Sequence, residues 1–187
     1  MDQLPQVATL EGYASIFNVP DQNGDIVAPG AFAASLQKSS PVRMLYQHAA
    51  DKPIGRWTSL REDARGLFVR GDIILSSGRA REVYALLGGG AIDGLSIGFQ
   101  TVKARKEAGG EGRRILKADL WEVSIVTFPM APSARVTHLG TPRNIRSGTS
   151  DTSLFADTLR DAGKILREPD CAVHRSTDHH RQTQRRA

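Results

Sequence analysis

The segment LWEVSIVTF, residues 120–128, carries the clearest indication of the fold. Its second half, VSIVTF, is an apolar run rich in the β-branched side chains that favour strands, so it is typical of a strand buried in a sheet. Glu122 is the one charged residue in the segment. A carboxylate buried among apolar side chains is costly unless it is paired. The sequence therefore predicts a buried strand whose Glu122 has a partner, either a structural arginine or a group in a reactive site.

Five further segments have the alternating or continuous apolar pattern of strands and are separated by turn residues. A pair of glycines at 109–110 marks a tight turn and predicts a hairpin between two of the segments. We therefore expect a mainly β fold with a few helices, of the α+β class. The six strand segments are Val7–Phe17, Val42–Gln47, Ile54–Leu60, Gly66–Leu75, Leu95–Lys103 and Arg114–Phe128.

Helical patterns are fewer. A short helix is expected within residues 31–39, directly after a Pro-Gly pair. A second is expected to begin with Ser76 or Ser77 as its N-cap and to end at Gly88, because apolar residues between them recur three and four positions apart. A third, amphipathic helix is expected in residues 154–166. Three aromatic residues are expected in the core: Trp57, Trp121 and Phe128.

Composition and charge change near residue 140. Residues 1–139 contain 16 Lys and Arg against 14 Asp and Glu, a net of +2, whereas residues 140–187 contain 9 against 6, a net of +3. The polar segment 140–150 lacks apolar periodicity and is typical of a linker. We therefore expect a domain at 1–139, a linker at 140–150, and a basic tail with one amphipathic helix at 151–187. No aromatic-rich basic strand accompanies the tail, so we expect only non-specific contact with nucleic acid.

Composition also excludes several classes of protein. The 187 residues, 40% of them hydrophobic, suffice for one domain with a sizeable core. The single cysteine, Cys171, excludes a disulfide framework and a multi-cysteine zinc site. The Asp-x-Asn-x-Asp pattern at 21–25 lacks the glycine and bidentate glutamate of a calcium loop. Neither a signal peptide nor an apolar run of membrane-spanning length is visible. We expect a soluble protein of a reducing compartment, without metal or cofactor.

One serine lies in an unusual setting. Residues 94–98, GLSIG, match the G-x-S-x-G pattern of α/β-hydrolases. In those enzymes a strand precedes the serine and a helix follows it; here the order is reversed, which disfavours an esterase of that class. A serine becomes a nucleophile only when a base, usually a neutral imidazole, lies within hydrogen-bond reach. The first 137 residues contain one histidine, His48. The residue types alone leave open whether His48 and Ser96 are structural or catalytic.

Four blocks of sequence, in this order, resemble the prohead (capsid maturation) proteases of tailed bacteriophages. Those are serine proteases similar in fold to the herpesvirus assemblin, so the resemblance implies a closed or partly closed β-barrel flanked by helices. It also makes residues 1–139 the protease domain. The blocks are GYASIFNVPDQNGDIVAPGAFAASL at 12–36, LYQHAADKPIGRW at 45–57, GAIDGLSIGF at 90–99 and DLWEVSIVTFPMAPSARV at 119–136.

The resemblance implies a catalytic site of histidine, serine and acid. The family's histidine matches His48 in LYQH, its serine matches Ser96 in GLSIGF, and its acid matches Glu122 in LWEVS. Asp119 is the second candidate for the acid. In a regular strand, residues three apart point to opposite faces, so only one of the two acids is expected to face His48. Backbone amides near Gly98 or Arg135 are candidates for the oxyanion hole.

The resemblance also implies substrates and a place of action. We expect a serine endopeptidase that cleaves scaffold, the major capsid protein and itself inside the assembling procapsid, in the host bacterial cytoplasm. A homo-oligomer is compatible with this expectation, whereas a membrane is not. The alternative is a catalytically idle capsid-assembly or scaffold factor with a basic tail.

Overall fold

The computed structural model describes residues 6–107 and 112–145, all of which lie in one compact unit, Met1–Ser147. Most of these residues are in strands, joined by two short helices. The strands are β1 (Gln6–Ile16), β2 (Ile26–Val27), β3 (Arg43–Tyr46), β4 (Ala49–Glu62), β5 (Gly66–Ile74), β6 (Gly94–Lys106), β7 (Arg113–Val126), β8 (Arg135–Leu139) and β9 (Arg143–Asn144). The helices are α1 (Ala33–Leu36) and α2 (Gly78–Gly88).

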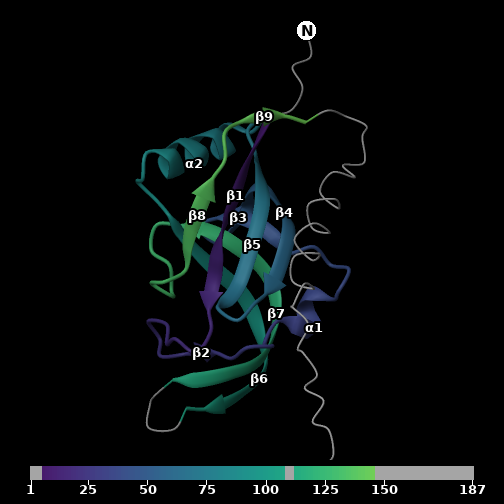
Figure 1. Cartoon of the computed structure of the whole chain (residues 1–187), viewed down its shortest axis with the longest axis vertical. Helices are drawn as coiled ribbons and strands as arrows, with labels where there is room; N and C mark the ends of the chain where they lie inside the picture. Colours follow the sequence, from purple (N-terminus) through teal and green to yellow (C-terminus); the bar gives the residue numbers. More distant parts are fainter. Residues whose placement is uncertain (1–5, 108–111, 146–187) are drawn as a thin grey trace, which may run out of the picture. The chain divides into compact units, whose positions relative to one another are not determined.

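Seven of these strands close into a barrel (Figure 1). Their order is β7-β3-β4-β5-β1-β8-β6, and pairing of β6 with β7 completes the ring. Neighbouring strands are antiparallel except β3 and β7, which run parallel. The shortest strand pairing in the ring is that between β8 and β6, which consists of the single pair Gly94–Arg135. The expected mainly β fold with a closed barrel is confirmed.

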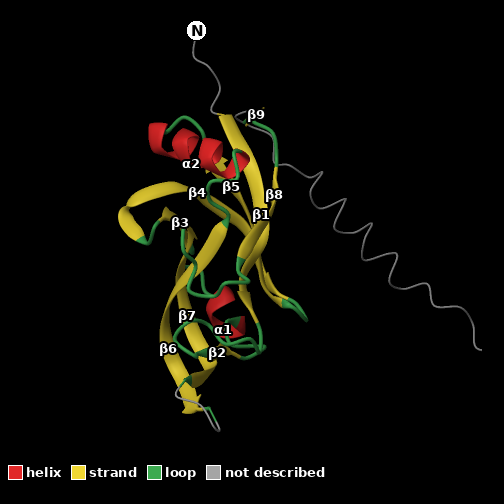
Figure 2. Cartoon of the chain, turned by 90° about the vertical axis from the view of Figure 1, so that its left-hand side faces the viewer, coloured by secondary structure: helices red, strands yellow, loops and turns green. Residues whose placement is uncertain are grey.

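The barrel interior is filled by the strand residues that the alternating pattern predicts. On β5, Leu67 and Val69 are fully buried while Arg70 is exposed. Burying a side chain of this size stabilises the folded state by about 1.5–3 kcal/mol. The two helices lie toward opposite ends of the barrel (Figures 1 and 2). Phe32, immediately before α1, is fully buried and meets Phe99 of β6 edge to face.

The six predicted strands all occur, with ends shifted by a few residues. The second predicted helix is α2, whereas the first shrinks to the single turn of α1. The sequence patterns missed three short strands: β2, β8 and β9. Because β9 pairs with β1, the fold continues into the segment predicted to be a linker. The amphipathic helix predicted at 154–166 and the basic tail lie outside the described residues.

Two of the three aromatic residues expected in the core are not there. Trp57 is partly buried against the core, but Trp121 is 58% exposed and Phe128 is 88% exposed. Trp121 occupies a β-bulge, since Gly98 of β6 pairs with Glu122 and the next residue, Phe99, pairs with Leu120. Phe128 lies beyond the end of β7. The apolar run at 123–128 therefore extends two residues beyond β7, and its last residue is not buried.

The helices α1 and α2, the two in the described part of the chain, are both too short to span a membrane.

Candidate active site

The two central strands of the site, β6 and β7, present opposite chemistry on their two faces. Leu95, Val123 and Ile125 point into the barrel and are fully buried. On the outer face, Ser96 lies directly across from Ser124, and Gly98 lies directly across from Glu122. Directly opposed residues of an antiparallel pair project to the same side, with their Cβ atoms about 4.5–5.5 Å apart. Ser96, Ser124 and Glu122 therefore share the outer face, which strand alternation separates from the core.

His48 reaches this face from a tight turn. Gln47 and His48 connect β3 to β4, with Tyr46 and Ala49 paired on either side. Both turn residues have positive φ, 55° and 57°, as the central residues of a type I′ hairpin require. For residues other than glycine this backbone conformation costs about 1–2 kcal/mol per residue, so the surrounding contacts must stabilise it.

Contacts with β7 provide that stabilisation. The Gln47 backbone N–H donates to the carbonyl of Ile125, and the Gln47 amide Nε2 donates to Thr127 Oγ1 at 2.7 Å. The His48 backbone N–H donates to Ser124 Oγ at 3.1 Å. The turn is thus attached to the strand that carries Glu122, which places the imidazole beside the carboxylate.

His48 Nδ1 and Glu122 Oε1 are 2.6 Å apart. The histidine side chain is 44% exposed and that of Glu122 is 13% exposed, so the imidazole is accessible to solvent while the carboxylate is mostly covered. The hydrogen bond to Glu122 raises the pKa of His48 above 6.5, burial opposes this, and the charge of the carboxylate adds to it. An imidazole held in this way has Nδ1 protonated and leaves Nε2 to act as the base.

The glycines around Ser96 make room for its neighbours on the outer face. A Cβ atom at Gly98 would lie 2.2 Å from Glu122 Oε1, a distance no real pair of atoms tolerates. A Cβ atom at Gly94 would lie 2.6 Å from the carbonyl oxygen of Val126 and 2.8 Å from Pro129 Cδ. The G-x-S-x-G spacing therefore serves close packing beside Ser96. Because Ser96 lies within strand β6 and is followed by more strand, the α/β-hydrolase alternative is wrong.

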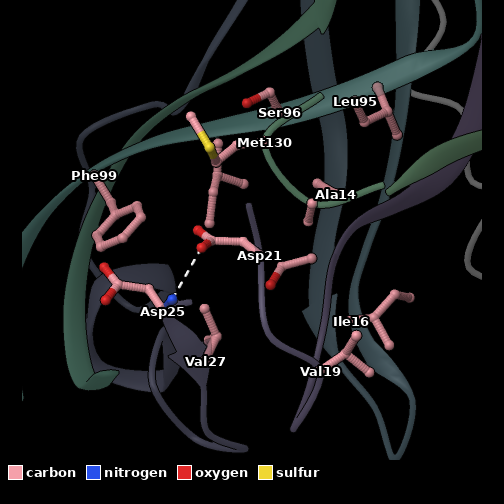
Figure 3. Close-up of a pocket in the computed structure, with 13 residues that line it drawn as sticks. Ala14, Ile16, Val19, Asp21, Asp25, Val27, Leu95, Ser96, Phe99 and Met130 are labelled. Carbon is pink, nitrogen blue, oxygen red and sulfur yellow. Dashed lines mark hydrogen bonds between the residues drawn. The ribbon is translucent and has the colours of Figure 1, made fainter. Parts of the chain in front are cut away.

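Ser96 borders a pocket as well as the outer face (Figure 3). The pocket lies where β8 no longer separates β1 from β6, and the loop before β2 and the loop after β7 close it. Its walls are mostly apolar, with the carboxylates of Asp21 and Asp25 on one side. Asp21 accepts the backbone N–H groups of Asn23 and Asp25, and Asp25 pairs with Arg113. Within the described residues, Ser96 Oγ makes no hydrogen bond to His48.

The other predicted residues have structural partners. Asp119 accepts a hydrogen bond from Lys38 Nζ at 2.6 Å, and this contact lowers the pKa of Asp119. The expectation that it faces away from Glu122 was wrong, because the bulge at Trp121 turns both carboxylates to the outer face. Glu122 lies beside His48, while Asp119 lies two β6 residues farther along, across from Gln100.

Arg135 binds the loop after β7 to the start of β6. Its guanidinium donates to the carbonyl of Pro132 at 2.9 Å and to Asp93 Oδ1 at 2.6 Å. Its side chain therefore positions the segment that precedes Ser96. No cluster of three or more His, Cys, Asp or Glu side chains suited to a metal ion occurs at 6–107 or 112–145.

Comparison with known proteins identifies the family. A family model described as caudovirus prohead serine protease matches residues 2–146. The chain belongs to this family. It is 34% identical over 161 residues to the prohead protease of Enterobacteria phage HK97, a match that covers 84% of this chain and 67% of that protein. It is also 30% identical over 124 residues to the capsid polyprotein of Pseudomonas phage PAJU2, covering 63% of this chain but only 18% of the polyprotein.

A solved herpesvirus protease structure has a similar fold. The protease of Kaposi's sarcoma-associated herpesvirus, crystallised with a hexapeptide phosphonate inhibitor, has a TM-score of 0.50 and 13% identity, covering 84% of this chain and 77% of that one. The varicella-zoster virus protease has a TM-score of 0.49 and 13% identity, covering 83% and 77%. The first of these supports the assemblin-like fold that the sequence resemblance implied. By family, this prohead protease is a capsid maturation protease of the serine class.

Proposed function

We propose that this prohead protease is an endopeptidase in which Ser96 is the nucleophile, His48 the base and Glu122 the orienting acid. The observation that carries the proposal is the 2.6 Å contact between His48 Nδ1 and Glu122 Oε1. The register of β6 and β7 puts Ser96 on the same outer face as Glu122, two residues along β6 from the position opposite it, and this supports the proposal further.

The chemistry follows from these positions. Ser96 Oγ attacks the carbonyl carbon of the scissile peptide bond while its proton passes to His48 Nε2. Glu122 accepts the hydrogen bond from Nδ1–H and stabilises the imidazolium that forms. The imidazolium then gives its proton to the leaving nitrogen, the C–N bond breaks, and an acyl-enzyme remains. A water molecule, deprotonated by the same imidazole, hydrolyses the ester and regenerates Ser96. Substrate binding brings the serine and imidazole within hydrogen-bond distance, since such contacts are often long in free enzymes.

The substrate reaches Ser96 along the edge of β6. The backbone N–H of Leu95 still donates to Ala134, but β6 pairs with β8 only at Gly94. Beyond Ser96, the side of β6 that faces away from β7 therefore has no strand partner in the barrel. An extended peptide that adds as a strand to this edge would place its carbonyl beside Ser96 and alternate side chains toward the apolar pocket.

Capsid and scaffold proteins are the proposed substrates, together with this chain itself. The similarity to a capsid polyprotein supports a link between the protease segment and capsid protein. Cleavage then takes place inside the assembling procapsid in the bacterial cytoplasm.

Co-expression with the capsid and scaffold genes of the same genome, followed by intact-mass measurement of every chain, tests the proposal. Wild type should yield shortened capsid or scaffold protein. Ser96→Ala should yield only full-length chains, because loss of the nucleophile costs about 10⁶-fold in turnover in a well-studied serine protease.

An idle assembly factor is the second candidate, and the missing contact between Ser96 Oγ and His48 favours it. It predicts that wild type and Ser96→Ala give particles with identical, unprocessed chains. Processing that persists unchanged in Ser96→Ala would instead contradict the assignment of the nucleophile.

A further inference from the structure

Ser124 lies at the centre of the candidate site without belonging to the proposed triad. It is fully buried in β7, two residues beyond Glu122 and directly across from Ser96. Its hydroxyl donates to Glu122 Oε2 at 2.6 Å. The same oxygen accepts the backbone N–H of His48 at 3.1 Å. One hydroxyl group therefore contacts both the acid and the backbone of the base.

These two hydrogen bonds fix different parts of the site. The bond to Oε2 sets the rotation of the carboxylate, so that Oε1 points at His48 Nδ1. The bond from the His48 N–H stabilises the turn at Gln47 and His48, whose positive φ values are unfavourable for residues other than glycine. A hydroxyl that satisfies both groups fixes the distance between base and acid.

We propose that Ser124 is a positioning residue that holds Glu122 and the His48 turn in the arrangement needed for catalysis. This proposal rests on the proposed function. Ser124 is not itself placed to be the nucleophile, because its proton is directed to Glu122 and its side chain is fully buried.

The variant Ser124→Ala removes both hydrogen bonds. The carboxylate is then free to rotate away from the imidazole, so the pKa of His48 should fall toward its ordinary value. His48 contacts Glu122 on β7, Arg43 on β3 is paired with Glu122, and Asp51 and Lys52 follow His48 along β4. Among these, Glu122 is the group that raises the pKa of His48.

Ser35→Ala is the matched control. Ser35 is also a buried serine whose Oγ accepts a backbone N–H of β7, that of Leu120, at 2.8 Å. Its loss leaves a buried β7 amide without an acceptor, as Ser124→Ala leaves the amide of His48, but it touches neither His48 nor Glu122. A purely structural role of Ser124 predicts the same result for both variants.

The experiment measures two properties of the full-length chain. An NMR titration of the imidazole C–H signals, assigned with His48→Gln, gives the pKa of His48. The rate of phosphonylation by a fluorophosphonate, in which a serine oxygen displaces fluoride from phosphorus, gives the reactivity of the site. Ser124→Ala should lower the pKa of His48 and slow phosphonylation about 10²-fold, the scale of a misplaced catalytic group. Ser35→Ala should change neither.

An unchanged pKa and rate in folded Ser124→Ala, or equal changes in Ser35→Ala, would overturn the proposal. If Ser124→Ala does not fold, Ser124→Cys carries the test, because the thiol fills similar space but is a weak donor. It should shift both readouts in the same direction, and no shift would again overturn the proposal. Failure of the proposed function gives a different result: wild type would not be phosphonylated, while the titration would still report whether Ser124 positions His48.

Discussion

His48 and Glu122 meet at 2.6 Å, and the hydrogen bond raises the pKa of the imidazole above 6.5. Only the neutral imidazole can accept the serine proton. Activity should therefore fall as the pH drops through this raised pKa, and the midpoint of the acid limb should lie above about 6.5. The pH dependence of the phosphonylation rate measures this midpoint. A rate that stays flat down to about pH 5 would contradict His48 as the base.

Replacement of the acids separates Glu122 from Asp119. Glu122→Gln should move the acid-limb midpoint to lower pH, because the carboxylate that raises the pKa of His48 is gone. It should also slow cleavage, by up to about 10⁴-fold if the tautomer is lost as in other triads. Asp119→Asn affects the contacts with Lys38 and Ser35, neither of which touches His48 or Glu122, and should leave both properties nearly unchanged. A time course of scaffold cleavage at matched folded concentration checks this, and the reverse order would make Asp119 the acid.

Gly98 should also be sensitive to substitution, because it faces the acid Glu122. A methyl group there would lie 2.2 Å from Glu122 Oε1, so Gly98→Ala must push the carboxylate away from His48. Cleavage should slow about 10²-fold while the barrel remains folded by circular dichroism. Gly88→Ala is the control, since its Cβ would meet only Leu139 Cδ2, at an ordinary 3.9 Å. Equal activities of the two variants would show that Glu122 does not need its present position.

At the scale of elements, the site depends on how the β3–β4 turn sits against β7. Gln47 contacts Ile125 and Thr127, and His48 contacts Ser124. The parallel pairing of β3 with β7 continues to Tyr46–Ile125, directly before the turn. The parallel pairing of β3 with β7 therefore also sets the distance between the base and the acid.

The strand β9 has only two residues, but one of them, Arg143, contributes to the stability of the fold. Arg143 Nη2 donates to Asp72 Oδ1 at 3.1 Å, and the Asp72 side chain is only 6% exposed. Arg143→Met should lower the free energy of unfolding by about 1.5 kcal/mol, the value of a hydrogen bond to a charged group. Arg79→Met breaks an exposed pair with Glu82 and should cost less than about 0.5 kcal/mol. Urea denaturation measures both values, and equal costs would contradict a role for β9 in the fold.

For the molecule as a whole, the sequence pattern predicted the positions of most strands better than it predicted how they close into a barrel. Periodicity located six strands because each presents an apolar face to one core. It missed β8, which has no buried residue, although β8 joins β1 to β6. Nothing in the sequence indicated the bulge at Trp121, because a bulge changes the pairing of two strands and not the apolar pattern of one.

The family resemblance supplied the three main residues of the candidate site as a prediction, but it did not supply their geometry. The turn at Gln47 and His48 contains no Gly, Asn or Asp, so it lacks the usual signal of a two-residue hairpin. Ser124 looked like part of an apolar run. Its spacing of two from Glu122 was the available signal, because residues i and i+2 of a strand share a face.

Covalent labelling shows whether Ser96 is a nucleophile activated by His48. The full-length protein is treated with a fluorophosphonate, digested, and the modified residue is located by mass spectrometry. We expect one adduct, on Ser96, formed at a rate that His48→Ala reduces to the background of unactivated serines. An adduct on Ser124 or another serine, or labelling of Ser96 that His48→Ala leaves unchanged, would contradict activation of Ser96 by His48.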